Sequence, residues 1–130
     1  MDIEYRIEEP ARRVFMRIGE TATGAAVSRR IADLAAARPE LAGWDWIQDV
    51  RENRGEVDNA DIAAVAEAFA DAPPGSCWTI FVSHDSNLSL WCRVMDAMFN
   101  GRLHRAAATP EAAVQLLDSL RAANPAPSSS

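Results

Sequence analysis

The chain contains no lysine, so arginine supplies all 13 of its basic residues, against 19 acidic ones. The net charge of −6 at pH 7 leaves no basic patch of the kind that binds a phosphate backbone, and we expect no nucleic-acid partner. The sequence also lacks an apolar run of the ~20 residues that a membrane span requires. The opening MDIEYRIEEP has no apolar segment of a signal peptide, and the sequence therefore predicts a soluble, cytoplasmic protein.

The sequence motifs of many enzymes and cofactor-binding proteins are missing as well. Glycine-rich phosphate loops, a Gly-x-Ser-x-Gly turn and an Asp-rich calcium loop do not occur. Cys77 and Cys92 have neither metal-ligand spacing nor a Cys-x-x-Cys pattern, which predicts two reduced thiols in the core. We therefore expect no metal, no cofactor and a protein that is not an enzyme.

The hydrophobic patterns that are present predict one α/β domain over residues 1–123, followed by a disordered tail at 124–130. In chain order they predict strands at 3–7 and 13–19, a helix from Thr21 or Thr23 to Ala37, a strand at 44–50, a helix at 58–70, a loop at 71–76, a strand at 77–83, a helix at 87–99, a strand at 103–109 and a helix opened by Thr109. The order ββαβαβαβα indicates a mainly parallel sheet of about five strands with an N-terminal antiparallel hairpin and four helices.

A dense group of charges joins the third strand to the second helix, in WIQDVRENRGEVDNADIAAVAEAF. Asp58 fits the N-cap of the helix and Asp61 its first turn, where carboxylates face the positive end of the helix dipole. Asp49 and Asp58 lie on opposite sides of a loop, which does not favour a shared metal site. The spacing therefore predicts a capped strand-to-helix corner.

A second group of polar residues follows the fourth strand. His84 and Asp85 would lie at the carboxyl ends of the parallel strands, together with Asp49 and Arg51, where α/β proteins bind ligands. A histidine beside an aspartate can act as a general base, so a small enzyme that uses Asp49, His84 and Asp85 is one alternative. The other is a loop histidine followed by a capping residue, Asp85 or Ser86.

The third helix carries more apolar residues than one buried face needs. Trp91, Met95, Met98 and Phe99 form a stripe typical of core packing, while Leu88, Leu90 and Val94 make the helix apolar on a second side. This surplus predicts a surface that contacts an apolar small molecule, such as a lipid, or a second copy of the chain. The predicted ligand or dimer surface consists of Leu90, Trp91, Val94 and Met98.

Two stretches of the sequence, together with the ββ start of the chain, are similar to STAS domains, in particular to the SpoIIAA-like branch of small bacterial proteins. IQDVRENRGEVDNADIAAV resembles the strand-loop-helix pattern of the family, with Asp49 as the strand aspartate and Val57–Asp58 as the step into the helix. LWCRVMDAMFNGRLHRAAATPEAAVQLL resembles the last helix-strand-helix unit. The resemblance covers about residues 3–120. It implies a STAS fold and, from the best-known members, a protein partner and antagonism of anti-sigma factors.

The chain departs from this family at the regulatory position. Antagonists carry a phosphorylated serine after the aspartate that opens the second helix, whereas Asn59 and Ala60 stand here and residues 29–75 contain no Ser, Thr or Tyr. We therefore expect a non-enzymatic interaction or regulatory module without the phosphorylation switch. The expected partner surface consists of Asp49, Arg51, Arg54, Asp58, Asn59 and Asp61.

Overall fold

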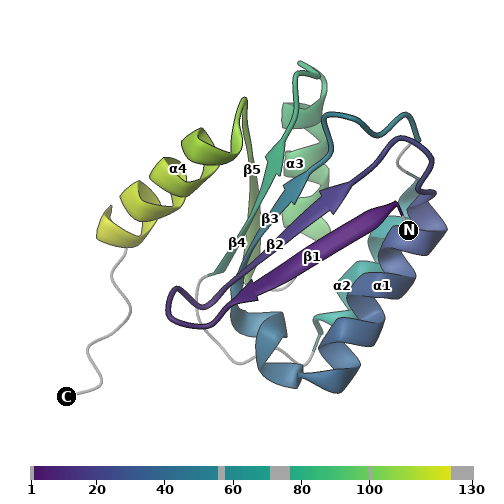
Figure 1. The fold of residues 1–130 in the computed structure, drawn as a ribbon, viewed down its shortest axis with the longest axis horizontal. Helices are drawn as coiled ribbons and strands as arrows, with labels where there is room; N and C mark the ends of the chain where they lie inside the picture. Colours follow the sequence, from purple (N-terminus) through teal and green to yellow (C-terminus); the bar gives the residue numbers. More distant parts are fainter. Residues whose placement is uncertain (1, 56–57, 71–76, 100, 124–130) are drawn as a thin grey trace.

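The computed structural model describes residues 2–55, 58–70, 77–99 and 101–123. Its elements are β1 (Ile3–Glu8), β2 (Arg13–Ile18), α1 (Gly24–Ala37), the short 3-10 helix η1 (Pro39–Gly43), β3 (Asp45–Asp49), α2 (Asn59–Ala68), β4 (Cys77–Val82), α3 (Leu88–Met98), β5 (Arg102–Ala107) and α4 (Pro110–Ala123) (Figure 1). The predicted order ββαβαβαβα is confirmed. The predicted loop at 71–76 and the predicted tail at 124–130 lie outside the described residues.

The five strands form one mixed sheet in the order β1-β2-β3-β4-β5. β1 and β2 pair antiparallel, as the predicted hairpin requires, and every later pair is parallel. The register places Trp46, Thr79 and His104 side by side on β3, β4 and β5. Neighbouring residues in register point to the same face of a sheet, so these three side chains share one face.

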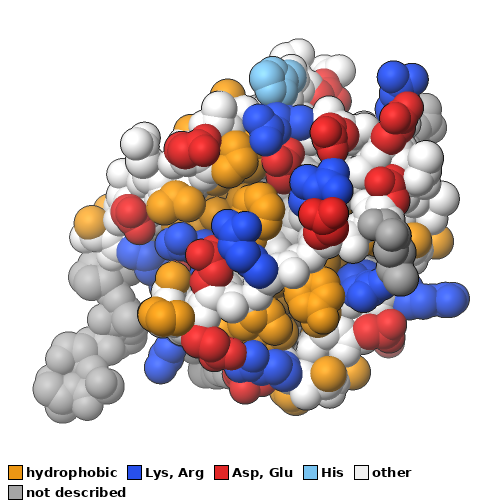
Figure 2. Space-filling model, in the orientation of Figure 1, with side chains coloured by type: hydrophobic (Ala, Val, Ile, Leu, Met, Phe, Trp, Pro, Cys, Tyr) orange, Lys and Arg blue, Asp and Glu red, His pale blue; other side chains and the backbone are white. Residues whose placement is uncertain are grey.

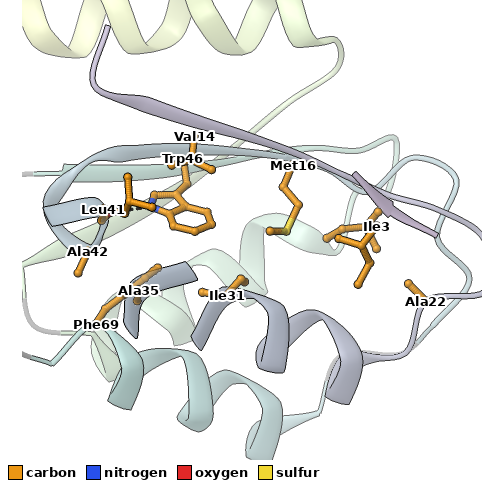
Figure 3. Packing of buried hydrophobic residues seen from close by; sticks show 11 residues of the cluster. Ile3, Val14, Met16, Ala22, Ile31, Ala35, Leu41, Ala42, Trp46 and Phe69 are labelled. Carbon is orange, nitrogen blue, oxygen red and sulfur yellow. Dashed lines mark hydrogen bonds between the residues drawn. The ribbon is translucent and has the colours of Figure 1, made fainter. Parts of the chain in front are cut away.

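The larger hydrophobic core lies between the sheet and α1, and Figure 3 shows its side chains there. Val14 and Met16 of β2 are fully buried against this layer, and Ile31 of α1 meets them from the helix side. Trp46 stacks at a tilt on Phe69, with 5.3 Å between the ring centroids. The strand residues alternate between the two faces, which is the period that the sequence of β2 predicts.

α4 covers the opposite face of the sheet (Figures 1 and 3). Ile47, Ile80 and Val82 pack there against Ala113 and Leu117, and all five are essentially inaccessible to solvent. β4 therefore has helices on both of its faces, as its nearly continuous apolar sequence predicts. No helix of the described part of the chain is long and apolar enough to cross a membrane.

Three of the helices begin at side-chain caps. The side chain of Thr23 accepts from the backbone N–H of Ala26, and that of Thr109 accepts from Ala112 N–H. The Asp58 carboxylate accepts from the N–H groups of Ala60 (2.6 Å) and Asp61 (3.3 Å). These contacts satisfy backbone donors that a helix start leaves unpaired, and they confirm the predicted capped corner.

One residue of the predicted hairpin differs from the alternation. Tyr5 stands between Ile3 and Ile7 but is 44% exposed. β1 is an edge strand, and the guanidinium of Arg30 on α1 lies 6.0 Å from the Tyr5 ring centroid. A tyrosine at a sheet edge can leave its ring at the surface because an arginine of the neighbouring helix covers part of it.

Candidate ligand cavity

A cavity of about 330 Å³ lies between the sheet and the helices α1, α2 and α3. Its volume falls within the range of about 300–1,000 Å³ that small-molecule sites occupy. The helices contribute mainly apolar side chains: Val27, Ile31, Ile62, Val65, Leu88 and Met95, with Phe99 after α3. The sheet contributes Ile18, Gln48, Thr79, Phe81 and His104, and the loops after β3 and β4 contribute Val50, Arg51, Ser83, His84 and Asp85.

The strand register orders these groups from the rim of the cavity inward. Val50, Ser83 and His84 follow the carboxyl ends of β3 and β4. Gln48 lies beside Phe81, and Thr79 lies beside His104 two residues further from that end of β4. The rim is therefore at the carboxyl edge of the parallel strands, where α/β folds bind ligands, and Thr79 and His104 are at the inner end.

Gln48 is one of the polar side chains that the sheet contributes to the cavity wall, together with Thr79 and His104. It is 6% exposed, lines the cavity and has no hydrogen-bond partner for its amide among the described residues. Its amide atoms are not among the fully enclosed side-chain atoms without a partner in the described residues, so they are open to the cavity. The Gln48 amide is therefore free to bond a molecule inside the cavity.

His104 is a second polar group of the wall, and α3 fixes its orientation. The Asp96 carboxylate lies 3.0 Å from His104 Nδ1 and 2.6 Å from its backbone N–H. Burial lowers the pKa of His104 to about 4 although Asp96 opposes the shift, so the ring is neutral at pH 7. Because the carboxylate can only accept, the single ring proton resides on Nδ1, and Nε2 is left as a hydrogen-bond acceptor.

The packing of His104 and Thr79 holds both groups in place. Phe81 stacks on the His104 ring, with 6.1 Å between centroids, and Phe99 meets it edge-on at 4.6 Å. The Thr79 hydroxyl accepts from Nη1 of Arg102 at 3.0 Å, so its own proton is available to another acceptor. Arg102 is buried and bonds the backbone carbonyls of Ala42, Trp44 and Trp78, which ties η1 to the sheet.

The predicted rim residues divide between the two faces of the sheet. Arg51, His84 and Asp85 line the cavity, whereas Asp49 does not. Asp49 is two residues from Ile47 and points with it toward the face of α4. Arg51 donates to both Asp49 carboxylate oxygens, at 2.9 and 2.7 Å; burial raises the pKa of Asp49, but these bonds outweigh it and the pKa is lowered.

The residues of the expected STAS-like partner surface lie close to the cavity, but most of them face outward. Asp58 and Asn59 are exposed at the start of α2, and Arg54 pairs with Glu20 at 3.3 Å on the surface. Asp61 contributes to the lining of the cavity. Figure 2 shows that, on the face drawn there, acidic and basic side chains are interspersed with hydrophobic ones.

The surplus apolar residues of α3 also face outward. Leu90 is 65% exposed and Val94 43%, Met98 is exposed at the end of the helix, and Trp91 is half-buried. None of these four residues lines the cavity, whose α3 wall is formed by Leu88 and Met95 on the inner side of the helix. α3 therefore has one side toward the cavity and a separate apolar side toward solvent.

Nucleophilic and metal chemistry have little support among the described residues. Burial raises the pKa of Cys92 to about 11 and also raises that of Cys77, so neither thiol is ionised at pH 7. In the part of the chain that the structure describes, no three His, Cys, Asp or Glu side chains are grouped to hold a metal ion. Asp96 and His104 form an acid–imidazole pair, but a pKa of about 4 makes His104 a weak base.

Sequence reasoning missed the polar groups inside the cavity. His104 and Arg102 point inward from β5, while Leu103 between them is partly exposed, the reverse of an apolar-inward pattern. Asp96 precedes His104 by eight positions on a different element, so no local spacing joins the two. The one signal available is the polar Gln48 within the apolar strand WIQDV.

Comparison of the chain with protein-family models, with curated proteins and with solved structures found no match. The resemblance to STAS domains stays a prediction, and the function is inferred from the cavity and the surfaces around it.

Proposed function

We propose that the protein binds a small, predominantly apolar molecule carrying a polar group in the cavity between the sheet and α1, α2 and α3. The observation that carries this proposal is the Gln48 amide, which is buried, lines the cavity and lacks a protein partner among the described residues. Because its atoms are open to the cavity, a molecule held there can reach them. A bound molecule supplies the missing hydrogen bonds.

The remaining lining agrees with a ligand that is apolar over most of its length. Aliphatic side chains from three helices and the rings of Phe81 and Phe99 form the walls. Arg51, His84 and Asp85 at the rim are polar and lie next to solvent. They can contact a polar group at the outer end of the ligand or line its route into the cavity. Pockets with apolar walls and a few placed polar groups are the usual form of small-molecule sites.

Native mass spectrometry of protein loaded with 1-octanol tests the proposal. Val65→Phe places a larger side chain at the cavity wall, and Val94→Phe makes the same change on the exposed side of α3. We expect wild type and Val94→Phe to carry the alcohol, and Val65→Phe to bind it at least tenfold more weakly. Equal binding by both variants, or no binding by wild type, would refute the cavity as the binding site.

We propose a second function for the outer side of α3, which is contact with a second copy of the chain. Leu90, Val94 and Met98 are four residues apart, lie on one side of the helix and are exposed. Two-fold dimers are the commonest assemblies of soluble proteins, and an exposed apolar stripe is suited to one. In sedimentation velocity, we expect a dimer that Leu90→Glu splits; a wild-type monomer at high concentration would contradict this.

The STAS resemblance supports a third role, in which the start of α2 contacts a protein partner. Asn59 is exposed beside the cap of α2 and cannot accept phosphate, so such contact would be constitutive. Asn59→Arg should release a partner that wild type retains in a pull-down from the source cell, while the control Glu67→Arg, on the same helix, should not. If both variants retain the same proteins as wild type, this role should be dropped.

A further inference from the structure

The inner end of the cavity pairs an acceptor with a donor on neighbouring strands. His104 Nε2 is the ring nitrogen left unprotonated, since Nδ1 bonds Asp96. Thr79 lies next to His104 in the register of β4 and β5, where strands are about 4.8 Å apart. Its hydroxyl oxygen already accepts a hydrogen bond from Arg102, so the hydroxyl proton can be donated to another acceptor.

His104 Nε2 is open to the cavity and is not sealed in protein, and Thr79 also contributes to the cavity lining. Among the described residues, the fully enclosed side-chain nitrogens without a partner are Nε of Arg13, Nε1 of Trp78 and Nε of Arg102. His104 Nε2 is not one of them, although no protein group bonds it in the described part of the chain. His104 is 2% exposed and lines the cavity, so the cavity is the space from which Nε2 can be reached.

We infer that the inner end of the cavity recognises its ligand through an uncharged hydroxyl group, which donates to His104 Nε2 and accepts from Thr79. This inference rests on the proposed function and names the ligand class. A carboxylate has no proton to give to Nε2, and its oxygens would face the nitrogen lone pair. An ether oxygen can accept from Thr79 but leaves Nε2 unpaired in an apolar site, which costs affinity.

Asp96 is a positioning residue in this arrangement, because it orients the His104 ring. It accepts from Nδ1 and from the backbone N–H of His104, and Arg105 lies 3.5 Å from its second oxygen. These contacts fix the ring orientation and the tautomer before a ligand arrives. The acceptor is therefore preorganised, and little ordering remains for the binding step.

Isothermal titration at pH 7 with a pair of isomeric probes tests the inference. 1-Octanol and heptyl methyl ether have the same atoms, but only the alcohol has a donor. We expect wild type to bind the alcohol about tenfold more tightly than the ether, and octanoate more weakly than the alcohol. If the alcohol and the ether bind equally, the inference is wrong while the proposed function stands; if neither binds, both are wrong.

Two variants and a spectroscopic measurement assign the preference to His104. His104→Phe should reduce the alcohol-to-ether ratio to within about twofold, because the acceptor is gone. Thr79→Val should weaken both probes and keep the ratio, because both use its donor. In wild-type protein labelled with ¹⁵N-histidine, the Nε2 resonance of His104 should shift with 1-octanol and not with the ether. This measurement does not depend on the folding of any variant. An unchanged Nε2 resonance at saturating alcohol would overturn the assignment.

Discussion

The two faces of the same sheet are packed in different ways. Toward α4, Ile47, Ile80 and Val82 meet Leu117 in a continuous apolar layer, and the buried Asp45 carboxylate is paired with Arg121 at 2.7 Å. Toward α1–α3, polar side chains on the same strands line a cavity of about 330 Å³. β3 contributes Ile47 to the first face and Gln48 to the second, so adjacent residues of one strand belong to the apolar layer and to the cavity wall. Both faces carry a hydrophobic core, but only the α1–α3 face combines its core with a cavity of this size and with polar side chains that line it.

The largest expected difference between the faces comes from the same substitution made on each. Leu117→Ala should cost about 3–4 kcal/mol of unfolding free energy, because it opens a void in a close-packed layer. Leu88→Ala should cost about 2 kcal/mol, because Leu88 already borders a cavity and fewer contacts are lost. Urea denaturation of both variants measures the difference. Equal costs would mean that the two faces are packed alike.

The pH dependence of stability sharpens the comparison through His104. The pKa of this residue is lowered from 6.5 to about 4 by burial, so between these pH values the unfolded state binds more protons. Stability contributed by the neutral ring is fully present above pH 6.5 and is lost as the pH falls toward 4, by about 3 kcal/mol. Asp96 opposes the shift, while Arg102 and Arg105 support it.

Urea midpoints measured between pH 7 and pH 4 test this dependence, and His104→Phe is the control. The variant should lose most of the slope in this range. Asp49 does not account for it, since its lowered pKa places its own loss of stability at more acidic pH, below about 4. An unchanged slope in His104→Phe would show that other groups produce the pH dependence.

A smaller effect on stability is expected at Gln48. Gln48→Met keeps the size of the side chain and removes an amide that is open to the cavity, so the stability of the free protein should change by less than about 1 kcal/mol. The same variant should bind 1-octanol more weakly than wild type if the amide contacts the ligand. A loss of stability greater than about 1 kcal/mol would instead mean that the amide has a partner in the free protein. Thermal denaturation with and without the alcohol gives both quantities.

An effect of about the same size is expected away from both faces, at the start of α2. Asp58→Ala removes the carboxylate that accepts from Ala60 and Asp61 N–H, and should cost about 1 kcal/mol. Ligand binding in the cavity should be unchanged, because Asp58 does not line it. An unaltered urea midpoint would contradict the role of the cap.

The features that sequence predicts well here have local causes. The caps at Thr23, Asp58 and Thr109 follow from side-chain bonds to the next few backbone N–H groups. The two-sided burial of β4 follows from its apolar run. The order of elements and the mixed sheet were therefore predictable from spacing alone.

The features that sequence did not predict arise from contacts between distant elements. His104 faces inward by its place in the register of β5, and Asp96 of α3 bonds its ring and its backbone N–H there; the spacing of the two residues in the sequence gives no hint of this contact. The cavity depends on how far α1, α2 and α3 lie from the sheet. The hydrophobic periodicity of the sequence does not specify this distance. His84 and Asp85 follow β4 and line the cavity as their sequence position predicts, while Asp49 is turned to the other face; binding of a ligand at this rim stays a prediction.

Methionine methyl groups on the two sides of α3 give the most direct measurement of the central claim. Met95 lines the cavity and is buried, and Met98, three residues on, is exposed on the outer side. In protein with ¹³C-labelled methionine methyls and saturating 1-octanol, we predict intermolecular NOEs from the alkyl chain to Met95 and none to Met98. NOEs to Met98 without any to Met95, or none to either methyl, would contradict a ligand site between α3 and the sheet.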